Sequence, residues 1–372
     1  RPAMKTTLRP RRRPSRTETA FEAAVSVFLW AFRILLVLLV VVGSVLTISS
    51  GKFSLETWVD LIVNGAVQGG IYALIALGYT MVYGIMKMIN FAHGEIFMIG
   101  IFAGYFTAEF LDEWGFLNAN VLTSVISFLL MMLIAAVAST LVALAVERVA
   151  YRPLRNSPRL VLLISAIGAS FFLQYTIAGM FGSGVYRYPT IDILEEDVAL
   201  PLLSALGLKW IEVVVIVAAL VMMAVLYLFV MRSKLGTAIR AVSEDKQTAA
   251  LMGIDVNRAI VTTFAVGAAM AGAAGVLYGT LWGVFNFFSG FIPGIKAFTA
   301  AVLGGIGNIP GAMVGGFVLG EAESIGALLI FDGLGVPAPG QLTDVIAFTI
   351  LVMVLMFRPQ GILGERLSRS RA

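Results

Sequence analysis

Long apolar stretches separated by short polar segments dominate this chain. A transmembrane helix needs about 20 mostly apolar residues, and nine stretches meet that length: 25–48, 61–86, 92–111, 121–146, 160–182, 211–231, 259–285, 311–331 and 342–357. A further apolar segment, 291–307, contains Pro293 and Lys296. We expect it to cross as a broken or short helix, covered by neighbouring protein or a water-filled cavity. The pattern predicts an all-α polytopic membrane protein with about ten crossings.

Composition narrows the chemistry further. Of 372 residues, 59% are hydrophobic and 13% are charged, whereas soluble domains carry roughly 25% charged residues. The chain has no cysteine and a single histidine, His93, so we expect no disulfide, no metal site and no cofactor. No cluster of nucleophile, acid and base is evident, which argues against a membrane enzyme and predicts no catalytic residue. The pI of about 9.3 comes from basic loops, so we expect the chain to contact a bilayer and no nucleic acid.

The basic residues also predict an orientation. They gather in 1–22, 147–159, 232–258 and the C-terminal segment, whereas the opposite side carries only Lys52, Arg187 and Lys209. The positive-inside rule then places both termini in the cytoplasm. Two cytoplasmic termini require an even number of crossings, which is why 291–307 is expected to cross.

The two ends of the chain differ from the middle. Residues 1–57 combine an Arg-rich cytoplasmic tail with an N-terminal anchor helix, because 25–48 is too long for a signal peptide and lacks a small-residue cleavage motif. Residues 58–364 form the main membrane domain, and 365–372 form a second cytoplasmic tail. The sequence suggests no role in transport for 1–57.

The pattern of apolar and charged residues in the cytoplasmic loop 232–258 predicts two short amphipathic helices, bracketed by Gly236 and Gly253. Their apolar stripes are Ala238, Ile239, Ala241 and Val242, then Ala249, Ala250, Leu251 and Ile254. They could contact a cytosolic ATPase or lie on the bilayer surface. The chain has no G-x-x-x-x-G-K-[ST] motif, so any ATP hydrolysis that drives it is expected on another polypeptide.

Polar residues at membrane depth are candidates for a substrate pathway. Asn64, Gln68, Tyr72, Tyr79 and Tyr83 form one stripe of the predicted helix 61–86. The stripe could line a channel, or it could bond to neighbouring helices.

A second polar group, Asn90, His93 and Glu95, surrounds Gly94. At a helix interruption these groups would suit the ammonium and carboxylate of a zwitterion. Alternatively, Glu95 and His93 bond to each other or lie at the cytoplasmic interface beside Lys87.

The second half of the chain echoes the first. Tyr83-Gly84 followed by Asn90-Phe91-x-x-Gly94 parallels Tyr278-Gly279 followed by Asn286-Phe287-x-x-Gly290. The two helices are predicted to run in opposite directions, so the echo indicates an inverted repeat with a path between its halves, unless the agreement is chance. This adds Asn286 to the pathway candidates.

Two further features of the second half have open interpretations. Lys296 could meet a substrate carboxylate, or pair with Glu321 or Glu323. We expect the glycines to pack at a partner interface; they are Gly304, Gly305, Gly307, Gly311, Gly315 and Gly316.

Five segments together resemble the LivH-type permeases of branched-chain amino acid ABC importers. They are VNGAVQGGIYALIALGYTMVYGIMKMINFAHGEIFMIG (63–100), ERVAYRPLRNSPRLVLLISAIGASFFLQ (147–174), AVSEDKQTAALMGIDVNRAI (241–260), AFTAAVLGGIGNIPGAMVGGFVLG (297–320) and MFRPQGILG (356–364). The resemblance spans about 60–364 and makes 58–364 an importer permease domain. Residues 1–57 are an extra element, and TAALMG (248–253) has one residue fewer before its glycine than the general importer motif.

The resemblance implies several partners in the bacterial inner membrane. They are a LivM-type second permease, two cytosolic ATP-binding subunits and a periplasmic substrate-binding protein. It also implies that the loop contacts the ATPase, with Gly236, Arg240, Glu244, Asp245, Ala249, Ala250 and Gly253 as the expected contact residues. Urea or short amides remain alternative substrates, and a stand-alone secondary transporter remains an alternative class.

Overall fold

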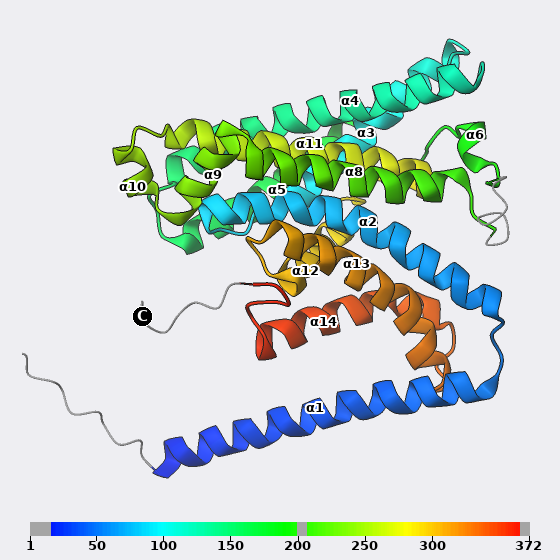
Figure 1. Cartoon of the computed structure of the whole chain (residues 1–372), viewed down its shortest axis with the longest axis vertical. Coiled ribbons are helices and arrows are strands. Elements are labelled where there is room, and N and C mark those ends of the chain that lie inside the picture. Colours follow the sequence, from blue (N-terminus) through cyan, green and yellow to red (C-terminus); the bar gives the residue numbers. More distant parts are fainter. Residues whose placement is uncertain (1–15, 199–206, 365–372) are drawn as a thin grey trace, which may run out of the picture. The chain divides into compact units, whose positions relative to one another are not determined.

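The computed structural model describes residues 16–198 and 207–364, which are almost entirely helical (Figure 1). The long helices are α1 (Arg16–Ser50), α2 (Leu55–Met86), α3 (His93–Glu113), α4 (Val121–Val146), α5 (Arg159–Phe181), α8 (Trp210–Arg232), α11 (Val256–Trp282), α13 (Ile309–Gly326) and α14 (Thr343–Phe357). The shorter elements are η1 (Glu147–Tyr151), η2 (Arg152–Leu154), β1 (Tyr186–Arg187), α6 (Asp192–Glu195), α9 (Lys234–Glu244), α10 (Lys246–Leu251), β2 (Val284–Phe285), α12 (Phe291–Gly304), η3 (Ala327–Asp332) and η4 (Pro339–Leu342).

The predicted spans are confirmed. Across the described residues, nine helices are long and apolar enough to cross a membrane, and Phe291–Gly304 is a shorter apolar helix. The prediction of 259–285 was three residues too long, because Gly283 adopts a left-handed conformation (φ 66°) and ends α11. Val284 and Phe285 then pair with β1. The predicted tails 1–15 and 365–372 lie outside the described residues.

The chain divides into two compact units. One comprises 1–52 and 328–339, and the other comprises 53–327 and 340–372. In the described part of the first unit, the Thr47 hydroxyl donates to the Leu329 carbonyl at 2.8 Å, and Lys52 pairs with Asp332 at 3.4 Å. The predicted N-terminal helix is therefore present as α1, and its role stays a prediction.

Glycines allow helices of the second unit to pack backbone to backbone. A side chain on Gly316 would lie 2.5 Å from the Ala73 backbone, where α13 crosses α2. Gly315 faces Ala300 of α12, and Gly304 faces Gly311 across the α12–α13 turn. The prediction that these glycines pack at a partner interface is therefore wrong for Gly304, Gly311, Gly315 and Gly316, because their close contacts lie within this chain.

Two helix interruptions meet inside the second unit. After α2, Lys87 adopts a left-handed conformation (φ 54°), and α3 then begins at His93. The His93 side chain packs against Gly78, which lies about two turns before the end of α2. After α11, the chain returns to begin α12 at Phe291. A side chain on Gly94 would lie 2.6 Å from the Gly290 carbonyl oxygen, so the starts of α3 and α12 are in contact. The two glycines of the sequence echo therefore touch, while the inverted repeat itself stays a prediction.

Candidate functional site

A cavity of about 220 Å³ lies beside the contact between α3 and α12, among α2, α3, α5 and α12. Tyr79 of α2 and Glu95 of α3 are its polar side chains, together with Ser170 of α5. Apolar side chains form the remaining wall: Phe91, Ile167, Phe171, Phe291 and Ile295. Gly94 and Gly294 contribute bare backbone. The site is therefore an apolar chamber with a carboxylate on one wall.

Glu95 is almost completely buried, with 1% of its surface exposed. Its Oε1 accepts a hydrogen bond from the Ser170 hydroxyl at 3.3 Å. Its Oε2 is buried and has no hydrogen-bond partner among the described residues. A buried charge without a counter-charge is costly, so this carboxylate has unused capacity to bind a cation or a proton.

His93 and Asn90 do not line this cavity. The His93 ring packs edge-on against Tyr79, with ring centroids 4.9 Å apart, and fills the space left by Gly78. The Asn90 side-chain oxygen accepts a hydrogen bond from Tyr151 at 2.6 Å. The alternative of a His93–Glu95 bond is wrong, because Glu95 bonds to Ser170. Both side chains are buried while Lys87 is exposed, and the alternative of a position near the cytoplasmic interface stays open.

The polar stripe of α2 splits between two environments. Gln68 donates to the Tyr72 hydroxyl, and Tyr72 donates to Oε2 of Glu323 on α13, both at 2.9 Å. This part of the stripe bonds to a neighbouring helix. Tyr79 instead faces the Glu95 cavity. Tyr83 is half-buried and Asn64 is exposed.

Lys296 is buried and lies between two carboxylates, of which Glu323 is buried and Asp344 is about half exposed. Its ammonium lies 2.9 Å from Glu323 and 2.7 Å from Asp344 of α14. It also lies 5.7 Å from the centre of the Tyr72 ring. The expected pair with Glu323 is therefore present, whereas Glu321 does not take part.

A second, more polar cavity of about 290 Å³ adjoins this network. Its wall includes Gln68, Tyr72, Asn286 and Lys296. The Asn286 side-chain oxygen is engaged locally, accepting from the Phe288 N–H at 2.8 Å and from the Ser289 hydroxyl at 3.3 Å. Asn286 thus shapes the turn before α12 as well as lining the cavity.

The loop 232–258 contains the two expected helices, α9 and α10, at the opposite end of the helix bundle from α6 (Figure 1). The first helix begins earlier than expected, because Ser233 caps it by accepting from the Gly236 N–H at 2.8 Å. A side chain on Gly236 would collide with the backbone of Phe229 and Val230. Gly236 therefore allows α9 to fold back on the end of α8.

The loop buries only part of its apolar surface. Ile239, Val242 and Ala249 are buried, whereas Ala250 is exposed and Leu251 and Met252 are 88% and 78% exposed. The expected stripe of Ala249, Ala250, Leu251 and Ile254 is therefore divided, because α10 ends at Leu251 and Gly253 turns the chain (φ 81°). Exposed apolar side chains at a loop tip are typical of an interaction surface.

Polar contacts fix the α9–α10 corner. Asp245 accepts from the Gln247 and Thr248 N–H groups and from the Thr248 hydroxyl. These bonds, those from Thr248 first, lower the pKa of the Asp245 carboxyl below its usual value. Arg240 and Glu244 lie on the exposed side of α9.

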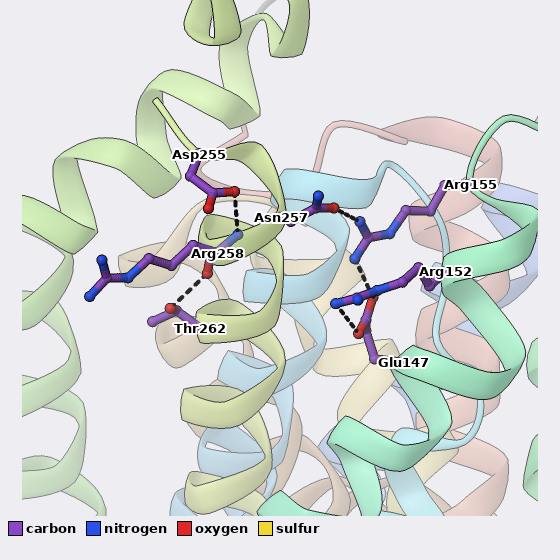
Figure 2. Close-up of polar contacts among 7 residues, drawn as sticks. All are labelled: Glu147, Arg152, Arg155, Asp255, Asn257, Arg258 and Thr262. Carbon is purple, nitrogen blue, oxygen red and sulfur yellow. Dashed lines mark hydrogen bonds and ion pairs between the residues drawn. The ribbon is translucent and has the colours of Figure 1, made fainter. Parts of the chain in front are cut away.

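A second polar cluster ties the loop after α4 to the start of α11 (Figure 2). Glu147 is 1% exposed and forms ion pairs with Arg152 and Arg155. Arg155 also donates to Asn257. The pKa of Lys246 is lowered, first by desolvation and then by the charges of Arg155 and Lys87. Arg155 and Lys87 therefore lie near enough to Lys246 for their charges to act on it.

Several residues of this region escaped the sequence analysis. Ser170, Ile167 and Phe171 lie on α5, where nothing in a long apolar run marks the buried face. Tyr151 and Glu147 resembled ordinary loop-boundary residues. Their partners are distant in sequence, and only tertiary packing brings them together.

The sequence has clear relatives. Residues 61–355 match the family described as branched-chain amino acid transport system / permease component. The high-affinity branched-chain amino acid transport system permease protein BraD of Pseudomonas aeruginosa is 45% identical over 83% of this chain and 96% of its own length. LivH of Escherichia coli, with the same description, is 42% identical over 81% and 94%.

A more distant relative is the probable branched-chain amino acid transport permease protein LivM of Methanocaldococcus jannaschii. It is 23% identical over 83% of this chain and 94% of its own length. No solved structure gave a significant match.

Proposed function

The chain belongs to the family of permease components of branched-chain amino acid transport systems, and on that premise we propose that it forms part of the pore of an ATP-driven importer for these amino acids. The 45% identity to BraD over 83% of the chain carries the proposal. The Glu95 cavity and the polar cavity beside Lys296 supply polar groups within a bundle of apolar helices.

We propose four partners, in keeping with that family. A LivM-type permease completes the pore, two cytosolic ATP-binding subunits supply the energy, and a periplasmic binding protein delivers the substrate. The chain itself hydrolyses no ATP and resides in the bacterial inner membrane. Its basic loops and both termini face the cytoplasm, which agrees with the clustering of Lys87, Arg155 and Lys246 at one end.

The tip of α9–α10 is the proposed contact with an ATP-binding subunit. Gly236, Asp245 and Gly253 shape this element, Ala249 packs it on the bundle, and the apolar side chains of Ala250, Leu251 and Met252 are exposed at its end. Arg240 and Glu244 flank the tip from α9. This arrangement can transmit movement, because α9 packs against α8, α11 and α2.

Reconstitution tests the proposal. The chain is assembled in liposomes with a LivM-type permease, both ATP-binding subunits and the binding protein, and uptake of labelled leucine and of urea is measured. We expect uptake of leucine, and not of urea, that requires ATP and the ATP-binding subunits. Accumulation by the chain alone, driven by protons or sodium, would contradict the proposal.

A loop variant tests the coupling element in the same assay. Leu251→Asp places a charge on the exposed apolar tip, and we expect leucine-stimulated ATP hydrolysis to fall about tenfold, the effect of losing roughly 1.4 kcal/mol of contact. Gln247→Glu adds the same charge to an exposed position on α10 and should leave hydrolysis unchanged. Equal rates in the two variants would argue against this contact.

A further inference from the structure

We propose that the cavity among α2, α3, α5 and α12 is the site where the translocated amino acid is bound in the membrane, with Glu95 binding its ammonium group. This inference rests on the proposed function and assigns the substrate's chemical groups to particular parts of the chain. It also assigns a role to α5, which contributes Ile167, Ser170 and Phe171 to the site.

The carboxylate of Glu95 has the properties of an ammonium receptor. It is 1% exposed, and its hydrogen bond to Ser170 leaves Oε2 without a partner among the described residues. None of the ion pairs in the described chain involves Glu95. An ionisable side chain held in a membrane domain without a counter-charge is a candidate for the pathway of a charged solute. Ser170 bonds one oxygen of the carboxylate without neutralising it, and both residues line the cavity.

The apolar wall of the cavity suits a branched aliphatic side chain. Phe91, Ile167, Phe171, Phe291 and Ile295 enclose the cavity with apolar surface. Its volume of about 220 Å³ exceeds the roughly 150 Å³ that holds one benzene molecule in an engineered cavity. A solute of leucine's size therefore fits, whereas a peptide does not. Urea has neither the charge for Glu95 nor an apolar group for this wall.

The substrate carboxylate has a counterpart in the two helix starts. Gly94 lies in the first turn of α3 and Gly294 in the first turn of α12, and both line the cavity. The N-terminus of a helix carries a partial positive charge, and interrupted helices in transporters direct such ends at anionic substrate groups. The two glycines pack against each other and the Gly294 N–H donates to the Gly290 carbonyl, so the helix ends act on the substrate carboxylate through their partial charge.

The parts thus match a zwitterion with an aliphatic side chain. A negative side chain faces the ammonium, two positive helix ends face the carboxylate, and an apolar wall faces the remainder. His93 supports this site from outside it by packing on Tyr79.

The reconstituted complex provides the test, with initial rates of ATP-dependent leucine uptake as the readout. Glu95→Gln removes the negative charge with little change in shape, and we expect uptake to fall roughly 10- to 100-fold, the effect of losing one charge-assisted hydrogen bond. Glu95→Asp keeps the charge and should restore part of the rate. Glu109→Gln makes the same change at an exposed position on the same helix and should match the wild type. Uptake by Glu95→Gln within twofold of wild type would overturn the inference.

A second variant addresses the apolar wall and does not depend on Glu95→Gln assembling correctly. Ile167→Trp fills part of the cavity from a half-exposed position on α5, so leucine uptake should fall several-fold more than alanine uptake. An unchanged ratio of the two rates would overturn the inference. If the wild-type complex moved no leucine, the proposed function would fail. If the wild type took up leucine and the variants took it up equally well, the binding site alone would be refuted.

Discussion

Two buried carboxylates on different helices of this protein have contrasting surroundings. Glu323 of α13 has a counter-charge, because Lys296 and Tyr72 both lie 2.9 Å from its Oε2, while its Oε1 has no hydrogen-bond partner among the described residues. Glu95 of α3 has one hydroxyl at 3.3 Å and no cation among the described residues. Both are at most 1% exposed. The protein therefore supplies a counter-charge to one carboxylate and leaves the other to be neutralised from outside.

On the proposed account, this difference separates a structural group, Glu323, from a recognition group, Glu95. A buried ion pair with hydrogen bonds holds helices in register, and breaking it leaves an uncompensated charge. In the second unit the Lys296 network joins α2, α12, α13 and α14. Glu95 joins only α3 to α5, by one long hydrogen bond. Loss of the Lys296 network should reduce stability, and loss of the Glu95 carboxylate should reduce transport.

The largest effect is expected from Lys296→Met. Removing the ammonium leaves Glu323 and Asp344 without their shared cation, so the free energy of unfolding in mixed detergent micelles should fall by about 3–5 kcal/mol. Adding Glu323→Gln should recover much of the loss. The Glu95→Gln variant should stay within about 1 kcal/mol of wild type. If Glu95→Gln were the more destabilised protein, the assignment of roles would be reversed.

A smaller effect is expected where α3 and α12 touch. Gly290→Ala places a methyl group against the Gly94 carbonyl oxygen and 2.8 Å from the Met98 side chain. The unfolding free energy should fall by about 1–3 kcal/mol. Gly84→Ala has open space around it and should be neutral or gain roughly 0.5–1 kcal/mol. Equal stabilities in chemical denaturation would show that the two helix starts do not touch.

The smallest effects compare the hydroxyl partners of the two carboxylates. Tyr72→Phe removes a 2.9 Å bond to Glu323 and should cost about 0.6 kcal/mol, the average for such bonds between membrane helices. Ser170→Ala removes the 3.3 Å bond to Glu95 and should cost less. Thermal unfolding in detergent compares the stabilities of the two variants. A larger loss of stability for Ser170→Ala than for Tyr72→Phe would mean that Glu95 has a structural role.

Much of this arrangement could be predicted from the sequence, because the bilayer imposes a simple length rule on apolar helices. The nine spans, the short tenth helix and the two loop helices followed from spacing, whereas the Lys296–Glu323 pair was one of three alternatives that the sequence left open. The packing partners of the glycines in α12 and α13 could not be predicted. A glycine indicates that another backbone approaches closely, but not whether that backbone belongs to the same chain. Ser170 and Asp344 could not be predicted, because the pairing of helices far apart in sequence depends on packing.

The site residues divide in the same way. Glu95 was identifiable because an acid inside an apolar run is rare. His93 and Asn90 were identifiable by the same logic, but the structure places them in packed contacts with Tyr79 and Tyr151. Polarity within apolar runs thus nominated these three residues, and the structure showed that Asn90 and His93 have packed partners whereas Glu95 has no counter-charge among the described residues.

Ligand-induced stabilisation of the purified permease pair tests the central claim most directly. A ligand that binds only the folded state raises its melting temperature, so millimolar leucine should raise that of wild type and leave that of Glu95→Gln unchanged. 4-Methylpentanoate, which is leucine without the ammonium group, should stabilise neither protein. Equal stabilisation of wild type and Glu95→Gln by leucine, or stabilisation of wild type by 4-methylpentanoate, would contradict the account.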